Sequence, residues 1–127
     1  MLKNFPCAKF LFFLGVVAVV VVVAVCLMPI DQLPLPSFHG VDKIEHFLTY
    51  LVLSFYFCQL LVRRWYFHST SLLVMLGILI EVLQSFTGYR MFDFWDIVAN
   101  SLGAMVGYYA GKNYGTVLQG CCRKVVC

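Results

Sequence analysis

FLFFLGVVAVVVVVAVCLM, residues 10–28, is the stretch that decides the fold. It is rich in valine, carries no charge and ends at Pro29. At about 1.5 Å per residue, a helix of this length matches the roughly 30 Å hydrocarbon thickness of a bilayer. A cleaved signal peptide is the competing interpretation, because Lys3 and Lys9 give the run a basic start. The core is long for a signal peptide and no small-residue cleavage site follows it, so we predict a membrane-spanning helix.

Three more apolar runs follow, at residues 44–62, 71–86 and 94–110, and the last two contain polar residues. The chain of 127 residues is 62% hydrophobic and only 12% charged, whereas soluble domains contain about 25% charged residues. This composition excludes an ordinary water-soluble globule. We therefore predict an all-α integral membrane protein with four transmembrane helices arranged as two hairpins.

The distribution of charge predicts how these helices thread the membrane. Most basic residues fall at the start, in the second loop and in the tail, namely Lys3, Lys9, Arg63, Arg64, Lys112, Arg123 and Lys124. The other two, Lys43 and Arg90, fall near the remaining loops, as do all six acids: Asp31, Asp42, Glu45, Glu81, Asp93 and Asp96. By the positive-inside rule, both termini are cytoplasmic in a multi-pass protein of the cell (inner) membrane. Residues 1–9 and 111–127 then flank a membrane domain of residues 10–110.

The nine basic residues lie between apolar runs and not on one polar face, so no nucleic-acid partner is expected. A disulfide framework is also not expected, because most of the six cysteines fall on the predicted reducing side. Cys121, Cys122 and Cys127 lie close enough in sequence to hold a metal ion. No histidine or further cysteine lies near them, so we assign them no metal and no role.

Polar residues first gather at the start of the second apolar run. Asp42, Glu45, His46, Thr49 and Tyr50 recur at spacings of three and four, which places them on one side of a helix. Capping explains Asp42 and Glu45 equally well, because both favour the positive end of the helix dipole. His46 lies one turn deeper, where capping does not account for it.

The third run contains Glu81 and Gln84, which share one helix face. Glu81 lies about six residues before the predicted external turn and so about 9 Å deep. A charged carboxylate at that depth costs about 2.5–3.5 kcal/mol, so it must be paired, protonated or in a watery cleft. We expect His46, Arg90, Asp96 or Asn100 as its partner, in a cavity open to the external side. A hydrogen bond that only packs helices together is the alternative.

The fourth run begins with Asp93, whose position suits a helix cap, and continues with Asp96 and Asn100, four residues apart on one face. The pair Asp96 and Asn100 echoes Asp42 and His46 in the second run, a weak sign of duplicated hairpins. We therefore expect the second and fourth helices to meet at this end.

Gly103, Gly107 and Gly111 continue the fourth run at intervals of four. Such a ridge of small residues lets another helix approach closely. Packing within the chain is the main interpretation, and a homodimer through these three glycines is the other.

Together these residues resemble the signature of the VanZ-like membrane proteins. The run DKIEHF at residues 42–47, with Tyr50, matches its first part, and the rest follows in order on later helices: Gly77, Glu81, Gln84, Arg90, Asp96, Asn100 and Gly103. The match covers a motif core of residues 42–107. One departure is the turn at residues 85–90, where the proline often found before the arginine is missing. The resemblance implies a bacterial cytoplasmic-membrane protein related to the teicoplanin-resistance protein, in a family with a poorly defined activity.

Two functions follow from these residues, and neither includes a cofactor. In the first, an external half-membrane cleft binds an anionic amphiphile, such as a membrane lipid or a lipid-linked envelope precursor, and contributes to glycopeptide (teicoplanin-type) resistance. Lys43 and Arg90 would bind the anion, and the remaining candidates would orient it: Asp42, His46, Glu81, Gln84, Asp96 and Asn100.

The alternative is an integral-membrane enzyme acting on lipid-linked substrates. His46 and Glu81 would serve as acid and base, or a divalent cation would be held by acids from three helices: Asp42, Glu81, Asp93 and Asp96. A proton-coupled transporter is a third reading.

Overall fold

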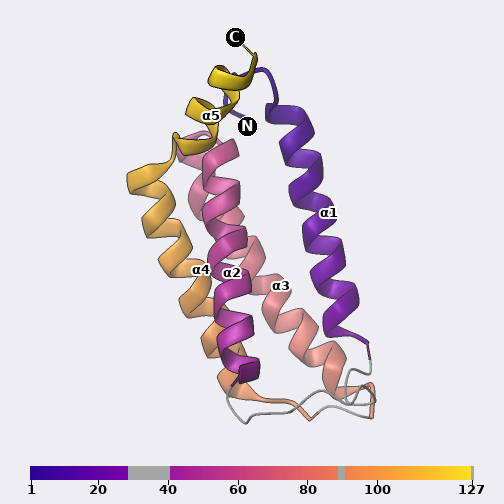
Figure 1. Cartoon of the computed structure of the whole chain (residues 1–127). Helices are drawn as coiled ribbons and strands as arrows, with labels where there is room; N and C mark the ends of the chain where they lie inside the picture. The colour runs from indigo at the N-terminus through magenta and orange to yellow at the C-terminus, as the bar shows by residue number, and fades with distance from the viewer. Residues whose placement is uncertain (29–40, 89–90, 127) are drawn as a thin grey trace.

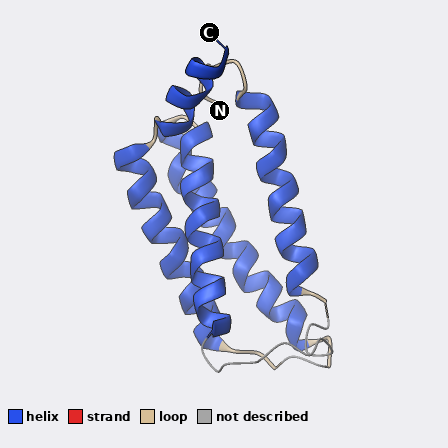
Figure 2. Ribbon diagram, in the orientation of Figure 1, coloured by secondary structure: helices blue, strands red, loops and turns tan. Residues whose placement is uncertain are grey.

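The computed structural model describes residues 1–28, 41–88 and 91–126, and nearly all of these are helical (Figure 2). The helices are α1 (Ala8–Cys26), α2 (Val41–Leu60), α3 (Tyr66–Ser85), α4 (Phe94–Tyr114) and α5 (Val117–Val126), with a 3-10 turn at Arg63–Trp65. Within the described residues the only strand-like element is an isolated bridge between Leu2 and Leu61. The all-α prediction is therefore confirmed.

The four long helices run alternately up and down, and both chain ends lie at the same end of the molecule (Figure 1). Helices α2 and α4 form the closest pair, α3 packs against both, and α1 lies at the edge. We name the end where α2 and α4 begin the site end, and the end that holds the N-terminus and α5 the terminal end. The predicted meeting of the second and fourth helices is confirmed.

The helix boundaries lie within five residues of the predicted runs, and helical structure also extends into the segment after residue 110, for which the sequence predicted no helix. Helix α4 continues to Tyr114, and α5 follows after a short turn. The sequence of α5, VLQGCCRKVV, mixes apolar and polar residues over only 10 positions. Such a segment lacks the long apolar run by which the other helices are recognised.

The molecule exposes apolar residues on its outside and buries polar ones inside. Large side chains such as Phe13, Val20, Leu72 and Met105 are exposed on the outer faces of the helices. The polar side chains buried within the bundle come from α2, α3 and α4: His46, Ser54, Gln59, Thr70, Glu81, Gln84, Asp96 and Asn100. Two segments, Ala8–Cys26 and Arg63–Ser85, are long and apolar enough to cross a membrane. The bundle therefore combines an apolar outer surface with an interior that holds both apolar residues, such as Leu53 and Phe57, and this polar set.

The glycines of α4 lie against α2. A Cβ atom added at Gly103 would lie 2.9 Å from the carbonyl carbon of Phe47, and one at Gly111 would lie 3.0 Å from the sulfur of Cys58. Gly107 is equally crowded by the backbone of α2. The two backbones therefore approach closely because these positions lack side chains.

Burial of this ridge supports the first of its two interpretations. Gly103, Gly107 and Gly111 are all buried within the chain, so the ridge packs α4 on α2, as the packing interpretation predicts. The homodimer through these glycines stays a prediction.

At the terminal end, the N-terminal segment ties α2 to α4. The ammonium group of Lys3 donates hydrogen bonds to the carbonyl oxygens of Cys58 (2.9 Å) and Gln59 (3.0 Å), and also to that of Gly115. The side-chain amide of Gln59 donates to the carbonyl oxygen of Tyr114 at 3.0 Å. These bonds satisfy carbonyl groups that the helix ends leave without partners.

The glycine ridge gives a matched pair of variants. A Gly120→Ala change in α5 meets no atom within 4 Å, so we expect it to leave stability unchanged or raise it by up to about 1 kcal/mol. Gly103→Ala forces a methyl group onto the Phe47 carbonyl, and we expect a loss of about 1–3 kcal/mol. Thermal unfolding of the detergent-purified protein by circular dichroism measures both. Equal stability of the two variants would show that α2 and α4 do not pack this closely.

Candidate functional site

Helix α2 brings three predicted polar residues to the site end. Lys43 is half-buried, whereas His46 and Tyr50 are 7% and 1% exposed and follow at spacings of three and four. Because α2 begins at Val41, Asp42 is the second residue of the helix and not its cap. Its negative charge still lies in the first turn, where it interacts favourably with the positive end of the helix dipole.

Asp93 caps α4, as predicted. It has an extended backbone, and its carboxylate accepts a hydrogen bond of 2.8 Å from the backbone N–H of Trp95. Its other oxygen lies 2.5 Å from the Lys43 ammonium, which is also 3.2 Å from Asp96. The Lys43 hydrogen bond, together with the Trp95 N–H, lowers the pKa of the Asp93 carboxyl. Lys43 therefore joins the start of α2 to the start of α4.

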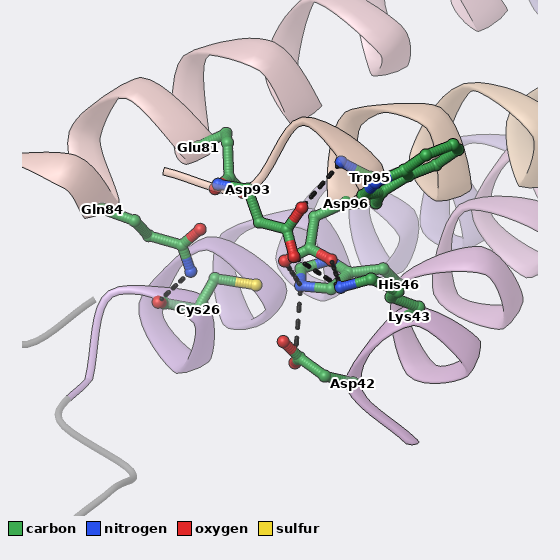
Figure 3. Close-up of polar contacts among 9 residues, drawn as sticks. All are labelled: Cys26, Asp42, Lys43, His46, Glu81, Gln84, Asp93, Trp95 and Asp96. Atoms are coloured by element: carbon green, nitrogen blue, oxygen red, sulfur yellow. Dashed lines mark hydrogen bonds and ion pairs between the residues drawn. The ribbon is translucent and has the colours of Figure 1, made fainter. Parts of the chain in front are cut away.

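His46 faces two carboxylates. Its Nε2 atom lies 3.7 Å from an oxygen of Asp42 and 3.8 Å from an oxygen of Asp96 (Figure 3). Both distances exceed the usual hydrogen-bond range. The Asp96 carboxylate is itself buried, with one oxygen toward Lys43 and the other toward His46.

Glu81 is 2% exposed and faces the interior of the bundle. Its carboxylate accepts a hydrogen bond of 2.6 Å from the backbone N–H of Asp93. The sequence predicted a side-chain partner and did not anticipate this backbone donor. The contact fixes the last turn of α3 to the start of α4, where the helix dipole favours a negative charge.

Gln84 connects the same cluster to α1. Its side-chain amide donates a hydrogen bond of 2.7 Å to the carbonyl oxygen of Cys26, the last residue of α1 (Figure 3). The hydroxyl of Thr87 in turn donates to the Gln84 backbone carbonyl at 2.6 Å. All four long helices therefore contribute to one polar region, which we name the polar cluster: Cys26, Asp42, Lys43, His46, Tyr50, Glu81, Gln84, Asp93, Asp96 and Asn100.

Several buried oxygen atoms of the polar cluster have no hydrogen-bond partner among the described residues. They are the hydroxyl of Tyr50, the amide oxygen of Gln84 and the amide oxygen of Asn100. Gly77 makes room for two of these side chains, because a Cβ atom there would lie 3.1 Å from the Tyr50 hydroxyl and from the Asn100 amide nitrogen. Most buried polar atoms in proteins are satisfied, so this concentration requires an explanation.

The structure gathers nearly all the predicted site residues into the polar cluster: Asp42, Lys43, His46, Glu81, Gln84, Asp96 and Asn100. Arg90, the remaining candidate, lies outside the described residues. The sequence did not assign Tyr50 to the site, and it assigned Asp93 only to the divalent cation of the alternative function. Tyr50 already belonged to the polar stripe of α2, and this spacing was the signal that could have found it.

The charge of the polar cluster differs from that expected of an anion site. Its described residues include four carboxylates, those of Asp42, Glu81, Asp93 and Asp96, and one ammonium, that of Lys43. Two of the carboxylates already bind this ammonium. Within the described part of the chain, the cluster is therefore acidic.

Two hollows lie elsewhere in the bundle. One, of about 320 Å³, is lined by apolar residues of α1, α2 and α3 such as Phe12, Phe57 and Leu72. The other lies between α3 and α4 near Met75 and Tyr108. Neither is lined by a residue of the polar cluster, so the predicted external cavity at Glu81 is not one of these hollows.

Comparison with known proteins agrees with these features. The profile of the VanZ/LLP1 family matches residues 10–114, which include the whole polar cluster. An uncharacterized protein of Schizosaccharomyces pombe is 41% identical over 69 residues, covering 49% of this chain and 41% of that protein. The chain thus spans about two fifths of this relative's length. No solved structure matches the chain significantly.

The contact of Glu81 with the α4 backbone predicts how substitutions affect stability. Glu81→Leu leaves the partly buried N–H of Asp93 without this acceptor, and we expect a loss of about 1–3 kcal/mol in the free energy of unfolding. Glu81→Gln keeps an oxygen acceptor of the same reach and should lose less. Chemical denaturation in detergent measures both.

The exposed neighbour Glu45 supplies the control for this pair. Glu45→Leu should change the free energy of unfolding by less than about 0.5 kcal/mol. If Glu81→Leu were as stable as this control, the hydrogen bond to α4 would not hold the helices together.

Proposed function

Because the chain belongs to the VanZ/LLP1 family, we propose that it is a multi-pass membrane protein whose polar cluster binds the headgroup of an anionic lipid or lipid-linked molecule. Four helices, α1 to α4, cross the membrane in two hairpins. Each has 19–21 residues, close to the about 20 that a bilayer requires. The exposed apolar side chains on their outer faces support this arrangement, because lipid tails solvate such surfaces.

The proposed orientation places the terminal end in the cytoplasm. Lys3, Lys9 and Lys112 belong to that end, as do Arg63 and Arg64 in the turn before α3. The described acids belong to the site end. The positive-inside rule then puts the site end on the external side of the membrane.

The three buried oxygen atoms without partners among the described residues carry the proposal of a ligand. The hydroxyl of Tyr50 and the amide oxygens of Gln84 and Asn100 all accept hydrogen bonds, so they suit a ligand that offers hydroxyl or amide donors. Glycerol and sugar headgroups supply such donors. Leaving these atoms unpaired would cost roughly 1–3 kcal/mol each, which a bound headgroup or ordered water would recover.

An anionic phosphate on the same ligand needs positive charge beside these acceptors. Lys43 supplies it once its bonds to Asp93 and Asp96 rearrange, and Arg90, which lies between α3 and α4 in the sequence, carries a planar fork suited to phosphate. A phospholipid or a lipid-linked envelope precursor combines both features. Resistance to a glycopeptide of the teicoplanin type would follow from altered access to such a precursor. The relative in Schizosaccharomyces pombe favours a lipid ligand that is not confined to bacteria.

A lipid-processing enzyme is the second candidate, favoured by the contacts of His46. A histidine that faces two carboxylates has the arrangement of a general base. The hydroxyls of Ser54 and Thr70 are not nucleophiles for it, because they bond to each other at 3.2 Å two turns deeper in the bundle. The enzymatic reading therefore requires an activated water molecule.

Tyrosine variants test the binding site without disturbing the fold. The Tyr50 hydroxyl has no partner among the described residues, so Tyr50→Phe should leave stability unchanged. We expect it to weaken binding of phosphatidylglycerol roughly two- to tenfold, the value of one hydrogen bond. Native mass spectrometry of protein exchanged from phosphatidylcholine nanodiscs into mixtures with phosphatidylglycerol measures the bound lipid.

Tyr56 provides the matched control, because its hydroxyl donates a hydrogen bond of 2.7 Å to the carbonyl of Leu11, far from the polar cluster. Tyr56→Phe should lower stability and leave lipid binding unchanged. No preference for phosphatidylglycerol over phosphatidylcholine in the unaltered protein, or equal binding by both variants, would refute the proposed ligand site.

Single-cysteine labelling tests the orientation. In a variant without native cysteines, a cysteine at the exposed position Met91 marks the site end and one at exposed His68 marks the terminal end. We expect a membrane-impermeant maleimide to label residue 91 in intact cells and residue 68 only after lysis. Labelling of residue 68 but not residue 91 in intact cells would show the opposite orientation. Labelling of both residues in intact cells would contradict four membrane-spanning helices.

A further inference from the structure

Three side chains of the polar cluster point their ligand atoms at one another. Carboxylate oxygens of Asp42 and Asp96 and the Nε2 atom of His46 all lie within 4.8 Å of each other. We name these residues the triad. His46 and Asp96 are buried, whereas the side chain of Asp42 is 47% exposed. The triad therefore lies at the edge of the bundle, open to solvent through Asp42.

The distances within the triad suit a shared cation better than hydrogen bonds. His46 Nε2 is 3.7 Å from Asp42 and 3.8 Å from Asp96, too far for either to accept its proton strongly. Ligand atoms at about 2.1 Å from one metal ion lie roughly 3.0–3.5 Å apart. The ligand atoms of the triad lie within 4.8 Å of one another, so side-chain movements of up to about an ångström would bring all three to such an ion.

The burial of His46 is an independent observation that points to a ligand. Its side chain is only 8% exposed, and its Nε2 atom is directed between the two carboxylates (Figure 3). Within the described part of the chain, it makes ion-pair contacts but no hydrogen bond at normal distance. A buried imidazole nitrogen in this state needs a proton acceptor in closer reach or a metal ion.

The charge and the surroundings of the triad agree with a cation. Four carboxylates and one ammonium group leave the described cluster acidic, and a divalent ion would offset two of these charges. Lys43 lies 3.2 Å from one oxygen of Asp96, so the other oxygen remains directed at His46. An outer contact of this kind orients a ligand carboxylate in metalloproteins.

We propose that Asp42, His46 and Asp96 form a binding site for one divalent transition-metal ion such as Zn²⁺ or Mn²⁺. The combination of one imidazole and two carboxylates suits these ions, whereas Mg²⁺ and Ca²⁺ favour sites made of oxygen alone. Three protein ligands leave coordination positions open to water or a phosphate oxygen. The sequence offered a divalent cation only within the alternative enzymatic function, held by carboxylates that include Asp42 and Asp96. It did not assign His46 as a ligand, because the triad joins residues of two helices that are 50 or more positions apart.

A Mn²⁺ titration of the full-length protein in detergent, after removal of metals by chelation, tests the site. Electron paramagnetic resonance reports free Mn²⁺, and we expect saturable binding of one ion per chain that Zn²⁺ displaces. His46→Gln should weaken the affinity at least tenfold. Asp42→Asn should do the same, and its exposed position lets it fold even if His46→Gln does not.

Glu45→Gln is the matched control, because it removes an exposed carboxylate from the same helix turn. It should bind Mn²⁺ as the unaltered protein does. Absence of saturable binding in the unaltered protein, or equal binding by Asp42→Asn and Glu45→Gln, would overturn the metal site. The titration contains no lipid, so its failure leaves the lipid-binding proposal standing, and a failed lipid experiment leaves the metal site standing.

Discussion

The close contact between α4 and α2 is the interaction on which the rest of the structure depends. Gly103, Gly107 and Gly111 form one face of α4, and the same face continues toward the site end through Asn100 and Asp96 at helical spacing. Because the glycines allow this face of α4 to pack closely against α2, Asp96 lies opposite the start of α2. The polar cluster is therefore a direct extension of the packing surface.

This dependence explains which features the sequence could predict. Spacings of three and four identify a shared face, so the polar stripes of α2 and α4 and their meeting were predictable. The hydrogen bond from the Asp93 N–H to Glu81 was not predictable. A backbone N–H carries no residue-type signal, and its position depends on the path of the chain between α3 and α4. The bonds from Lys3 to carbonyl groups of α2 and Gly115 escaped prediction for the same reason.

The distribution of polarity also separates two roles for the helices. The valine-rich α1 is almost wholly exposed and contributes one backbone carbonyl, that of Cys26, to the polar cluster. Helices α2 and α4 carry the charges and lie closest together. In the proposed membrane arrangement this division is favourable, since polar groups gain most when they face one another and not the lipid.

The two ends of the bundle differ in how completely their polar groups are satisfied. At the terminal end, the Gln59 side chain uses both its donor and its acceptor, bonding to Tyr114 and to the N–H of Val117 at 3.0 Å each. At the site end, the amide oxygens of Gln84 and Asn100 are buried without partners in the described chain. Both ends bury polar groups between helices, and at the terminal end the protein's own atoms supply the hydrogen-bond partners of Gln59. The acceptors at the site end are thus the atoms that a bound headgroup or ordered water would satisfy.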